Sequence, residues 1–327
     1  MVAAETSAPS AADVLDPQVL RFVNEIARGF ARYPALDRLS PPEARRIAEE
    51  VREPWRRGGP AMRRTEESFV PVGDAALRVR IYYPGGPGPK PGFIYLHGGG
   101  WTLFSIDTHD RLMREYAARA DVVAVGVDYP LSPEAKFPVA LEHIVGLVRW
   151  LGEHGLAREI DPRRLAIGGD SAGANLAVAA CLMLRDAGEA HRLRGMLLSY
   201  GAFDADCSAE AAHRYGADGF PLSHQEMSRF WENYIRAPED VRNPLVCPLR
   251  AHLERLPPAF LTIPECDLLT EQNLAMAERL HQAGVPVRHE IYRGASHSFL
   301  EAVAISDVAD RAVADGSRWL RETLTDR

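Results

Sequence analysis

The sequence lacks paired cysteines and an excess of basic residues. None of its four cysteines (Cys181, Cys207, Cys247 and Cys266) forms a CxxC pair, which disfavours a disulfide framework in a chain of this length. Acidic residues outnumber Lys and Arg by 45 to 38, and the formal net charge is −7. Because no block of Lys or Arg could form a phosphate-binding surface, we expect no nucleic-acid partner.

Long apolar runs and metal-binding motifs are also missing. The longest apolar stretch, around Ala172 to Leu184, is too short to span a bilayer. The opening residues, MVAAETSAPSAADVLDP, have neither the basic start nor the apolar core of a secretory signal. The eleven histidines show no HExxH or paired spacing, which disfavours a metal hydrolase. We therefore expect a cytoplasmic protein that does not act at a membrane and needs no cofactor.

Alternating strands and helices dominate the chain from Ser68 onward. Eight short strand-like segments occur at 68–72, 76–84, 92–100, 122–129, 164–169, 194–200, 259–264 and 287–292. Five helical segments lie between or after them, near 107–119, 138–153, 172–186, 270–283 and 303–323. Apolar strands that alternate with helices predict an α/β fold with a mostly parallel sheet covered on both faces. Ligands of such sheets bind at the carboxyl ends of the strands.

Two segments depart from this alternation. Residues 16–33 and 40–55 have helical spacing of apolar residues and precede every strand, so they predict an N-terminal helical cap over residues 1–60. Almost sixty residues separate the strands that end near Tyr200 and begin near Ala259, and they contain a predicted helix at 223–235. A long insertion at a strand end suits a lid. We therefore assign 204–245 to a lid, and 61–203 with 246–327 to the catalytic domain.

The stretch from Gly169 to Gly173 reads GDSAG, a G-x-S-x-G motif. It directly follows a predicted strand and opens a predicted helix, which is the setting of a nucleophile elbow. The tight turn strains the serine backbone and requires small neighbours, a requirement that Ala172 and Gly173 meet. The helix N-terminus places positive dipole near Ser171. The alternative interpretation is a plain glycine-rich loop between a strand and a helix.

A second glycine motif, His97-Gly98-Gly99-Gly100-Trp101, ends an earlier predicted strand. Acyl transfer forms a tetrahedral oxyanion, which needs converging N–H groups that a backbone without side chains can supply. HGGG after the third strand is the form of this device in lipases and esterases. The alternative is a generic glycine turn.

A serine nucleophile needs a histidine base and an acid that orients it, which in this fold follow the serine in the order acid, histidine. Only His297 lies in a short loop just after the last predicted strand, whereas His281 falls within a helix and His289 within a strand. Asp267 directly follows a predicted strand. Its competitors for the acid are Glu265 and Glu271.

The stretches FIYLHGGGW, DTHDR, DYPLSPEAKFP, GDSAGANLA and HSFLEA together resemble the hormone-sensitive-lipase-like branch of the α/β-hydrolases, and within it the bacterial acetyl esterases. The resemblance implies the α/β-hydrolase fold, with an eight-stranded sheet and a helical cap formed by the N-terminus and an insertion after the sixth strand. It implies a catalytic triad of Ser171, His297 and Asp267. It also implies an oxyanion hole made by the N–H groups of Gly98, Gly99 and Ala172.

The expected activity is two-step hydrolysis of short acyl esters, from acetyl to butyryl, without a cofactor. Bulky side chains near the glycine loop and in the lid could wall the acyl pocket; the candidates are Trp101, Phe203, Phe220, Phe230 and Trp231. These side chains could instead pack the lid onto the core. Rival functions are an amidase or peptidase, a deacetylase of one metabolite, and a non-catalytic small-molecule receptor. The protein is expected to be a monomer or a homodimer that pairs through the last strand.

Overall fold

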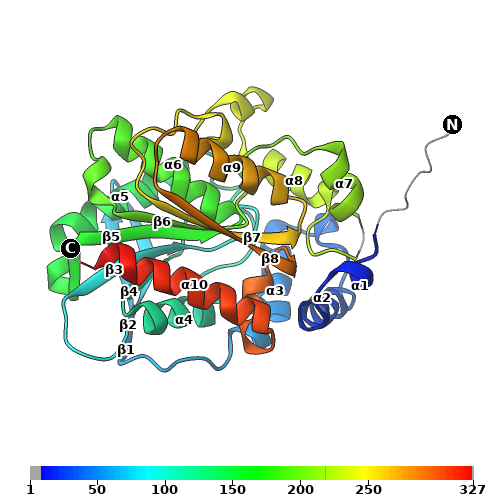
Figure 1. Cartoon of the computed structure of the whole chain (residues 1–327), viewed down its shortest axis with the longest axis horizontal. Coiled ribbons are helices and arrows are strands. Elements are labelled where there is room, and N and C mark those ends of the chain that lie inside the picture. The colour runs from blue at the N-terminus through cyan, green and yellow to red at the C-terminus, as the bar shows by residue number, and fades with distance from the viewer. Residues whose placement is uncertain (1–8, 218, 326–327) are drawn as a thin grey trace.

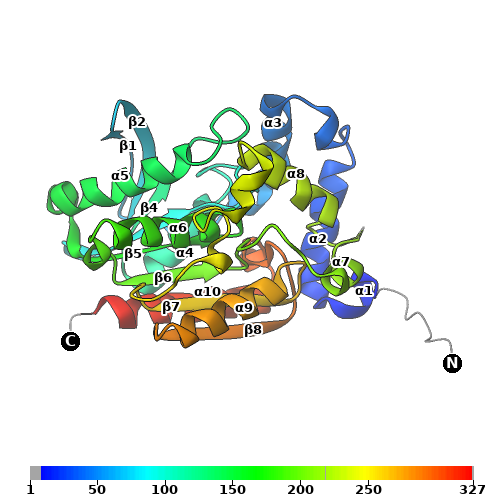
Figure 2. The ribbon, with the colours of Figure 1, turned by 90° about the horizontal axis from the view of Figure 1, so that it is seen from above.

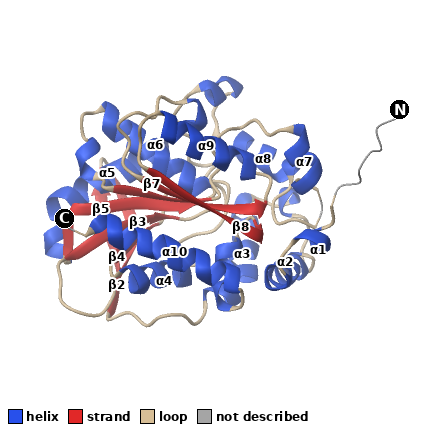
Figure 3. Ribbon diagram, viewed as in Figure 1, coloured by secondary structure: helices blue, strands red, loops and turns tan. Residues whose placement is uncertain are grey.

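An eight-stranded sheet runs through the centre of the molecule (Figure 1 and Figure 3). The structure is a computed structural model that describes residues 9–217 and 219–325. The first residues of the predicted segment 1–60 and the last residues of the predicted segment 246–327 therefore lie outside the described residues. The strands are β1 (Arg64–Val72), β2 (Ala75–Tyr83), β3 (Lys90–Leu96), β4 (Val123–Val127), β5 (Ile160–Asp170), β6 (Gly195–Ser199), β7 (Ala259–Cys266) and β8 (Val287–Ser296).

The strand order is β1-β2-β4-β3-β5-β6-β7-β8. β1 pairs with β2, and β2 with β4, in antiparallel fashion, and the remaining neighbours are parallel. Every residue of β4 and β6 is buried, as expected for parallel strands covered on both faces. The predicted α/β-hydrolase fold with a mostly parallel eight-stranded sheet is confirmed.

Helices cover both faces of this sheet (Figure 1). One face carries α5 (Val139–His154), α6 (Ala172–Asp186) and α9 (Thr270–Gln282), and the other carries α4 (Asp110–Ala120) and α10 (Asp307–Leu324). Each helix turns apolar side chains toward the sheet, and two large apolar clusters result, one on each face. The sheet is thereby a rigid platform whose strand ends can hold a site.

The N-terminal helices are α1 (Ala11–Val14), α2 (Pro17–Phe30) and α3 (Pro41–Arg52). The Asp16 carboxylate caps α2 by accepting from two backbone N–H groups, and Ser40 with Glu43 forms a capping box at the start of α3. Capping groups of this kind satisfy N–H donors that the helix leaves unpaired. The apolar face of α2 packs into the same cluster as α4 and α10.

The insertion between β6 and β7 contains two helices, α7 (Ala209–Tyr215) and α8 (His224–Tyr234). α8 matches the predicted helix, whereas sequence analysis did not predict the shorter α7. Seen from above, α7 and α8 lie beside α1, α2 and α3 at one end of the sheet (Figure 2). Among the described residues, no helix combines the length and apolar character needed to cross a membrane.

Candidate active site

Ser171 lies on the turn between β5 and α6, with a backbone φ of 52° and ψ of −118°. Such angles are strained for a residue with a side chain and persist only where the surroundings enforce them. Its N–H donates to the carbonyl oxygen of Ser199 on the next strand, at 2.9 Å. A Cβ on Gly169 or Gly173 would lie 2.0 or 1.9 Å from the carbonyl oxygen of Leu96. Both glycines of the motif are therefore required, because β3 passes directly against the turn.

A continuous chain of hydrogen-bond contacts joins three side chains at the carboxyl ends of β5, β7 and β8. Ser171 Oγ lies 3.0 Å from His297 Nε2, and His297 Nδ1 lies 2.8 Å from Asp267 Oδ2. The Asp267 carboxylate also accepts from the N–H of Leu269, at 3.0 Å. All three side chains are buried. The structure thus brings together the serine, histidine and aspartate that the sequence singled out.

The competing candidates lie elsewhere. His281 is on α9 and His289 is on β8, away from this chain of contacts. The Glu265 carboxylate accepts from the N–H of Gly294, and Glu271 belongs to the first turn of α9. None of them has a hydrogen bond to His297 among the described residues.

Two further residues hold the Asp267 and His297 loops in place, and sequence analysis did not identify either. The Asn273 amide accepts from the N–H of Gly201 and donates to the carbonyl oxygens of Gly201 and Leu269. The ring of Tyr200 packs edge-on against the imidazole of His297, with centroids 5.0 Å apart. The only feature of the sequence that could have indicated either role is the position of Asn273, an asparagine early in the helix that follows Asp267.

The glycine loop requires a correction. The N–H of Gly98 donates to Asp170 Oδ1 at 3.0 Å, so it is directed at a carboxylate and cannot also serve a substrate oxygen. Among the described residues, no hydrogen bond uses the N–H of Gly99, Gly100 or Ala172. The N–H of Gly98, which the sequence assigned to the oxyanion hole, is therefore already paired, whereas the N–H of Gly100, which sequence analysis left out, has no partner among the described residues.

The Asp170 carboxylate, at the end of β5, holds the glycine loop in place. Besides the Gly98 N–H, its carboxylate accepts from the Tyr95 hydroxyl at 2.7 Å, and His109 Nε2 lies 3.4 Å away. Burial by itself would lower the pKa of His109, but the neighbouring Asp170 carboxylate outweighs it and raises that pKa. His97, with its ring close to that of His109, has its pKa lowered to about 3, chiefly by burial. Asp170 occupies the variable position before the serine in the G-x-S-x-G motif. The only feature of the sequence that could have indicated its role is an acidic residue at the end of a buried strand.

The bulky candidates for the acyl pocket divide into two groups. Trp101 is buried, stacked on Tyr234 at 4.3 Å and against Trp231 at 4.5 Å between ring centroids. The Phe203 ring is fully buried on the backbone of Gly201. Trp101, Phe203 and Trp231 are therefore buried in packing against other residues of the protein, and their assignment as substrate contacts stays a prediction.

Phe220 and Phe230 are only partly buried. Phe220 contacts Tyr215 edge-on, with centroids 5.5 Å apart. Phe230, on α8, covers the glycine loop closely, since a Cβ on Gly100 would come within 2.1 Å of its ring. The lid therefore reaches the glycine loop through Phe230.

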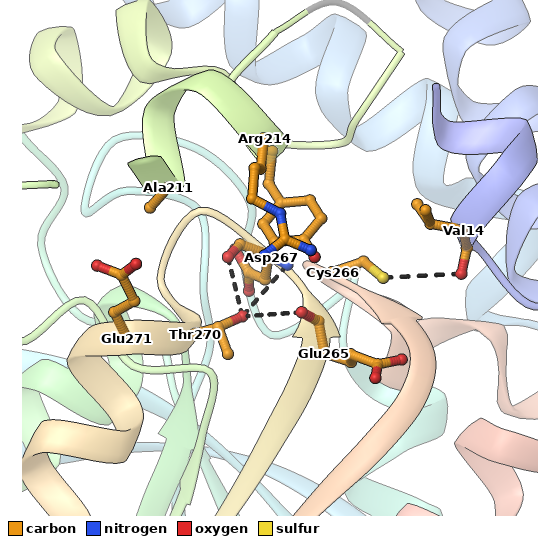
Figure 4. A pocket seen from close by; sticks show the side chains of 9 residues that line it. Val14, Ala211, Arg214, Glu265, Cys266, Asp267, Thr270 and Glu271 are labelled. Carbon is orange, nitrogen blue, oxygen red and sulfur yellow. Dashed lines mark hydrogen bonds between the residues drawn. The ribbon is translucent and has the colours of Figure 1, made fainter. Parts of the chain in front are cut away.

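A cavity of about 460 Å³ opens beside the Asp267 loop (Figure 4). Its lining comes from α1, α7, the end of β7, the loop that follows it and the start of α9, namely Val14, Ala211, Arg214, Tyr215, Glu265, Cys266, Asp267, Thr270 and Glu271. Neither Ser171 nor His297 lines it, and the Asp267 side chain is fully buried. The cavity thus adjoins the loop of the acid rather than the nucleophile. Among the described residues, no cluster of His, Cys, Asp or Glu is arranged to hold a metal ion.

Comparisons with known proteins place this site in a family. A family model described as alpha/beta hydrolase fold matches residues 93–301. EstE1, a thermostable carboxylesterase cloned from a metagenomic library, is 30% identical; the match covers 88% of this chain and 99% of EstE1, with a TM-score of 0.85. An esterase of the archaeon Pyrobaculum calidifontis is 28% identical over 94% of this chain and 98% of its own, with a TM-score of 0.89.

A third similar structure is the ester hydrolase EH1AB1 from the metagenome of Lake Arreo, solved in complex with a derivative of bipyridine phosphonate. It is 30% identical, and the match covers 94% of this chain and 98% of that protein, with a TM-score of 0.87. The chain belongs to the α/β-hydrolase fold family and, within it, to the hormone-sensitive-lipase-like branch of carboxylic ester hydrolases.

Proposed function

We propose that the protein is a serine carboxylesterase that hydrolyses esters of short acyl chains, from acetyl to butyryl. The observation that carries this proposal is the chain of contacts from Asp267 through His297 to Ser171. It ends beside three backbone N–H groups that no described residue uses, those of Gly99, Gly100 and Ala172. A nucleophile, a base, an orienting acid and oxyanion donors are the parts that acyl transfer requires.

The first chemical step is attack by Ser171 Oγ on the ester carbonyl carbon. Asp267 accepts the Nδ1–H of His297, which leaves Nε2 as the acceptor for the serine proton. As the new C–O bond forms, that proton moves to Nε2, and the imidazolium is stabilised by the Asp267 carboxylate. The proton then passes to the leaving alcohol oxygen as the ester C–O bond breaks. Water repeats the sequence on the acyl-enzyme and releases the acid and free Ser171.

The oxyanion forms next to the start of α6 and the glycine loop. Preorganised N–H groups there stabilise charge as it develops and need no reorganisation during the reaction. Gly99, Gly100 and Ala172 are the donors in this proposal, with Gly100 in the place first given to Gly98. The positive end of the α6 dipole adds to this stabilisation.

The preference for short acyl chains rests on the lid. Phe230 lies on the glycine loop at Gly100, and the next residue of that loop, Trp101, packs against the rings of Trp231 and Tyr234. Rigid aromatic packing at this position leaves little room for a long alkyl chain. The esterases with similar structures support the reaction class and leave the chain length to be measured.

The reaction class is tested by Ser171→Ala. We expect the fold to persist, because alanine is smaller, and kcat for p-nitrophenyl acetate to fall by about 10⁴- to 10⁶-fold, to the residual level typical of triad knockouts. A serine-directed phosphonate should label the wild type with one equivalent and the variant not at all. Unchanged turnover by the variant would remove Ser171 from the mechanism.

The acyl preference is tested with p-nitrophenyl esters from C2 to C12. We expect kcat/KM to be highest between C2 and C4 and to fall by at least about tenfold by C8, a loss of about 1.4 kcal/mol of transition-state stabilisation. Phe230→Ala should lessen this fall, because it removes the ring from the glycine loop. A maximum at C10 or longer in the wild type would contradict the proposed substrate class.

A further inference from the structure

A buried ion pair lies next to the catalytic histidine and takes no part in the mechanism above. Arg52 is the last residue of α3, and Glu301 belongs to the short helix η7 (Phe299–Ala304) that directly follows the His297 turn. Their side chains approach to 2.9 Å between Nη1 and Oε2. Arg52 is 6% and Glu301 5% exposed. The pair therefore joins the N-terminal cap to the segment that carries His297.

Each charge of this pair depends on the other. Neither carboxylate oxygen of Glu301 accepts a hydrogen bond from a described residue, and Nε of Arg52 likewise has no partner there. Buried charges are costly unless compensated, and removing one member of a buried pair is far more harmful than removing both. Because so few other groups compensate these two charges, burying the pair costs more free energy than a purely structural contact would justify.

Arg52 also contacts a side chain that packs against the glycine loop. Its guanidinium lies over the ring of Phe104, 4.8 Å from the centroid, and over Phe22 at 5.6 Å. Phe104 in turn lies against the glycine loop, since a Cβ on Gly99 would be 2.8 Å from its Cδ2. One side chain of the cap is therefore linked to both parts of the proposed site, to the glycine loop through Phe104 and to the segment after His297 through Glu301.

The charged and titratable surroundings of His297 are few. Asp267 faces it from the loop after β7, and Tyr200 from the end of β6. Burial raises the pKa of Tyr200, and the carboxylates of Asp170 and Glu301 raise it further. Glu301 therefore has an electrostatic effect on Tyr200, whose ring contacts His297. On α4, His109 faces the same two carboxylates and Arg52.

We propose that Arg52 is a positioning residue of the active site, which aligns the His297 segment through Glu301 and the glycine loop through Phe104. This role rests on the proposed serine esterase function. Misplacement of reacting groups by about 1 Å can cost a factor of about 10² in rate. We expect Arg52→Met to lower kcat for p-nitrophenyl acetate by about 10- to 100-fold while KM changes by less than about threefold.

The pair also predicts a split between the kinetic constants. Arg52→Met and Glu301→Gln each break the link between the cap and the segment after His297, so each should lower kcat per active site and leave KM nearly unchanged. A purely structural role would lower the active fraction and leave kcat per active site unchanged.

The experiment compares five variants with the wild type, each with its active fraction counted by phosphonate titration. Ile47→Ala is the matched control, because Ile47 is buried on the same helix and is an apolar residue outside the pair; we expect a lower Tm and kcat within about twofold of wild type. Arg52→Lys keeps the charge without the planar face and should have an intermediate kcat. The double variant Arg52→Met/Glu301→Met removes both charges, so it should fold even if a single variant does not, and its kcat should stay low.

Three results would overturn the assignment: a double variant with wild-type kcat, an Ile47→Ala variant that loses as much kcat as Arg52→Met, or an Arg52→Met variant whose kcat per active site equals that of the wild type. If the wild type hydrolyses no ester and takes up no phosphonate, the proposed function itself fails, and that outcome is distinct from all three.

Discussion

Two aspartate–histidine pairs lie on either side of Ser171, and they differ in what the histidine can reach. In the pair Asp267–His297, the carboxylate holds Nδ1 at 2.8 Å and the free Nε2 meets Ser171 Oγ. In the pair Asp170–His109, the imidazole lies 3.4 Å from the carboxylate, and that carboxylate is bonded to Tyr95 and to the backbone of Gly98. The first pair ends at Ser171, the proposed nucleophile, and the second ends at the glycine loop.

The difference shows how the same two residue types serve separate purposes. A histidine that must exchange protons needs one nitrogen facing the reacting group. A histidine that supports a loop can be fully enclosed, and its charge then stabilises a carboxylate that organises backbone N–H groups. Chemistry and preorganisation are therefore divided between the two pairs, and variants in each should produce different losses.

The largest loss is expected at the first pair. Asp267→Asn keeps the shape of the side chain but removes the charge that stabilises the imidazolium and fixes the tautomer of His297. We expect kcat to fall by about 10⁴-fold, with KM little changed. Steady-state kinetics on p-nitrophenyl acetate measure this, and a fall of less than about tenfold would show that another group orients the base.

A smaller loss is expected from Asp170→Asn. The amide oxygen can still accept from Tyr95 and Gly98, but the attraction to His109 is lost and the loop loosens. Loss of one oxyanion donor costs about 10²- to 10³-fold, so we expect a fall in kcat of about 10- to 100-fold. The control is Asp161→Asn, since Asp161 is also buried on β5 but pairs with Arg164 at the opposite end of the strand; equal losses in both variants would contradict a role for Asp170 in the site.

The smallest effect is expected in the pH dependence of stability. The pKa of His109 is raised in the folded state, so its contribution is complete below the unfolded pKa of about 6.5 and is lost as the pH rises through the folded pKa. Each unit of that rise corresponds to about 1.4 kcal/mol. Denaturant unfolding of the wild type between pH 6 and 9 should show this decline, and His109→Gln should not.

His97 does not obscure this measurement. Burial lowers its pKa to about 3, so its effect on the free energy of unfolding appears as the pH falls below about 6.5, whereas the His109 contribution is lost as the pH rises above that value. Parallel curves for the wild type and His109→Gln between pH 6 and 9 would show that Asp170 does not hold a charged His109.

The sequence predicted the fold because its signals are local. The period of the apolar residues distinguishes strands from helices, and the alternation of the two is enough to predict a parallel sheet. The structure brings Ser171, Asp267 and His297 together because each follows a strand whose carboxyl end lies on the same edge of the sheet. Their catalytic roles stay a prediction until the variants are measured.

What sequence analysis missed depends on contacts between distant segments. A run of three glycines cannot show that the N–H of Gly98 points to Asp170, because that direction is set by a carboxylate on another strand. An aromatic residue beside a motif, such as Trp101, can line a cavity or fill one, and only the stacking on Tyr234 decides between them. The pairing of Arg52 with Glu301 has no local pattern at all.

That pairing has a consequence for how the protein is made. Arg52 is translated well before Glu301, so the cap helices wait for their partner while the residues between them are synthesised, at about 5–20 residues per second. Until η7 emerges from the ribosome, the Arg52 guanidinium lacks the Glu301 carboxylate with which it pairs in the folded protein. A nascent chain that already carries the elbow and the glycine loop would still lack His297 and its alignment, so hydrolysis would begin only once the two ends of the fold have closed on each other.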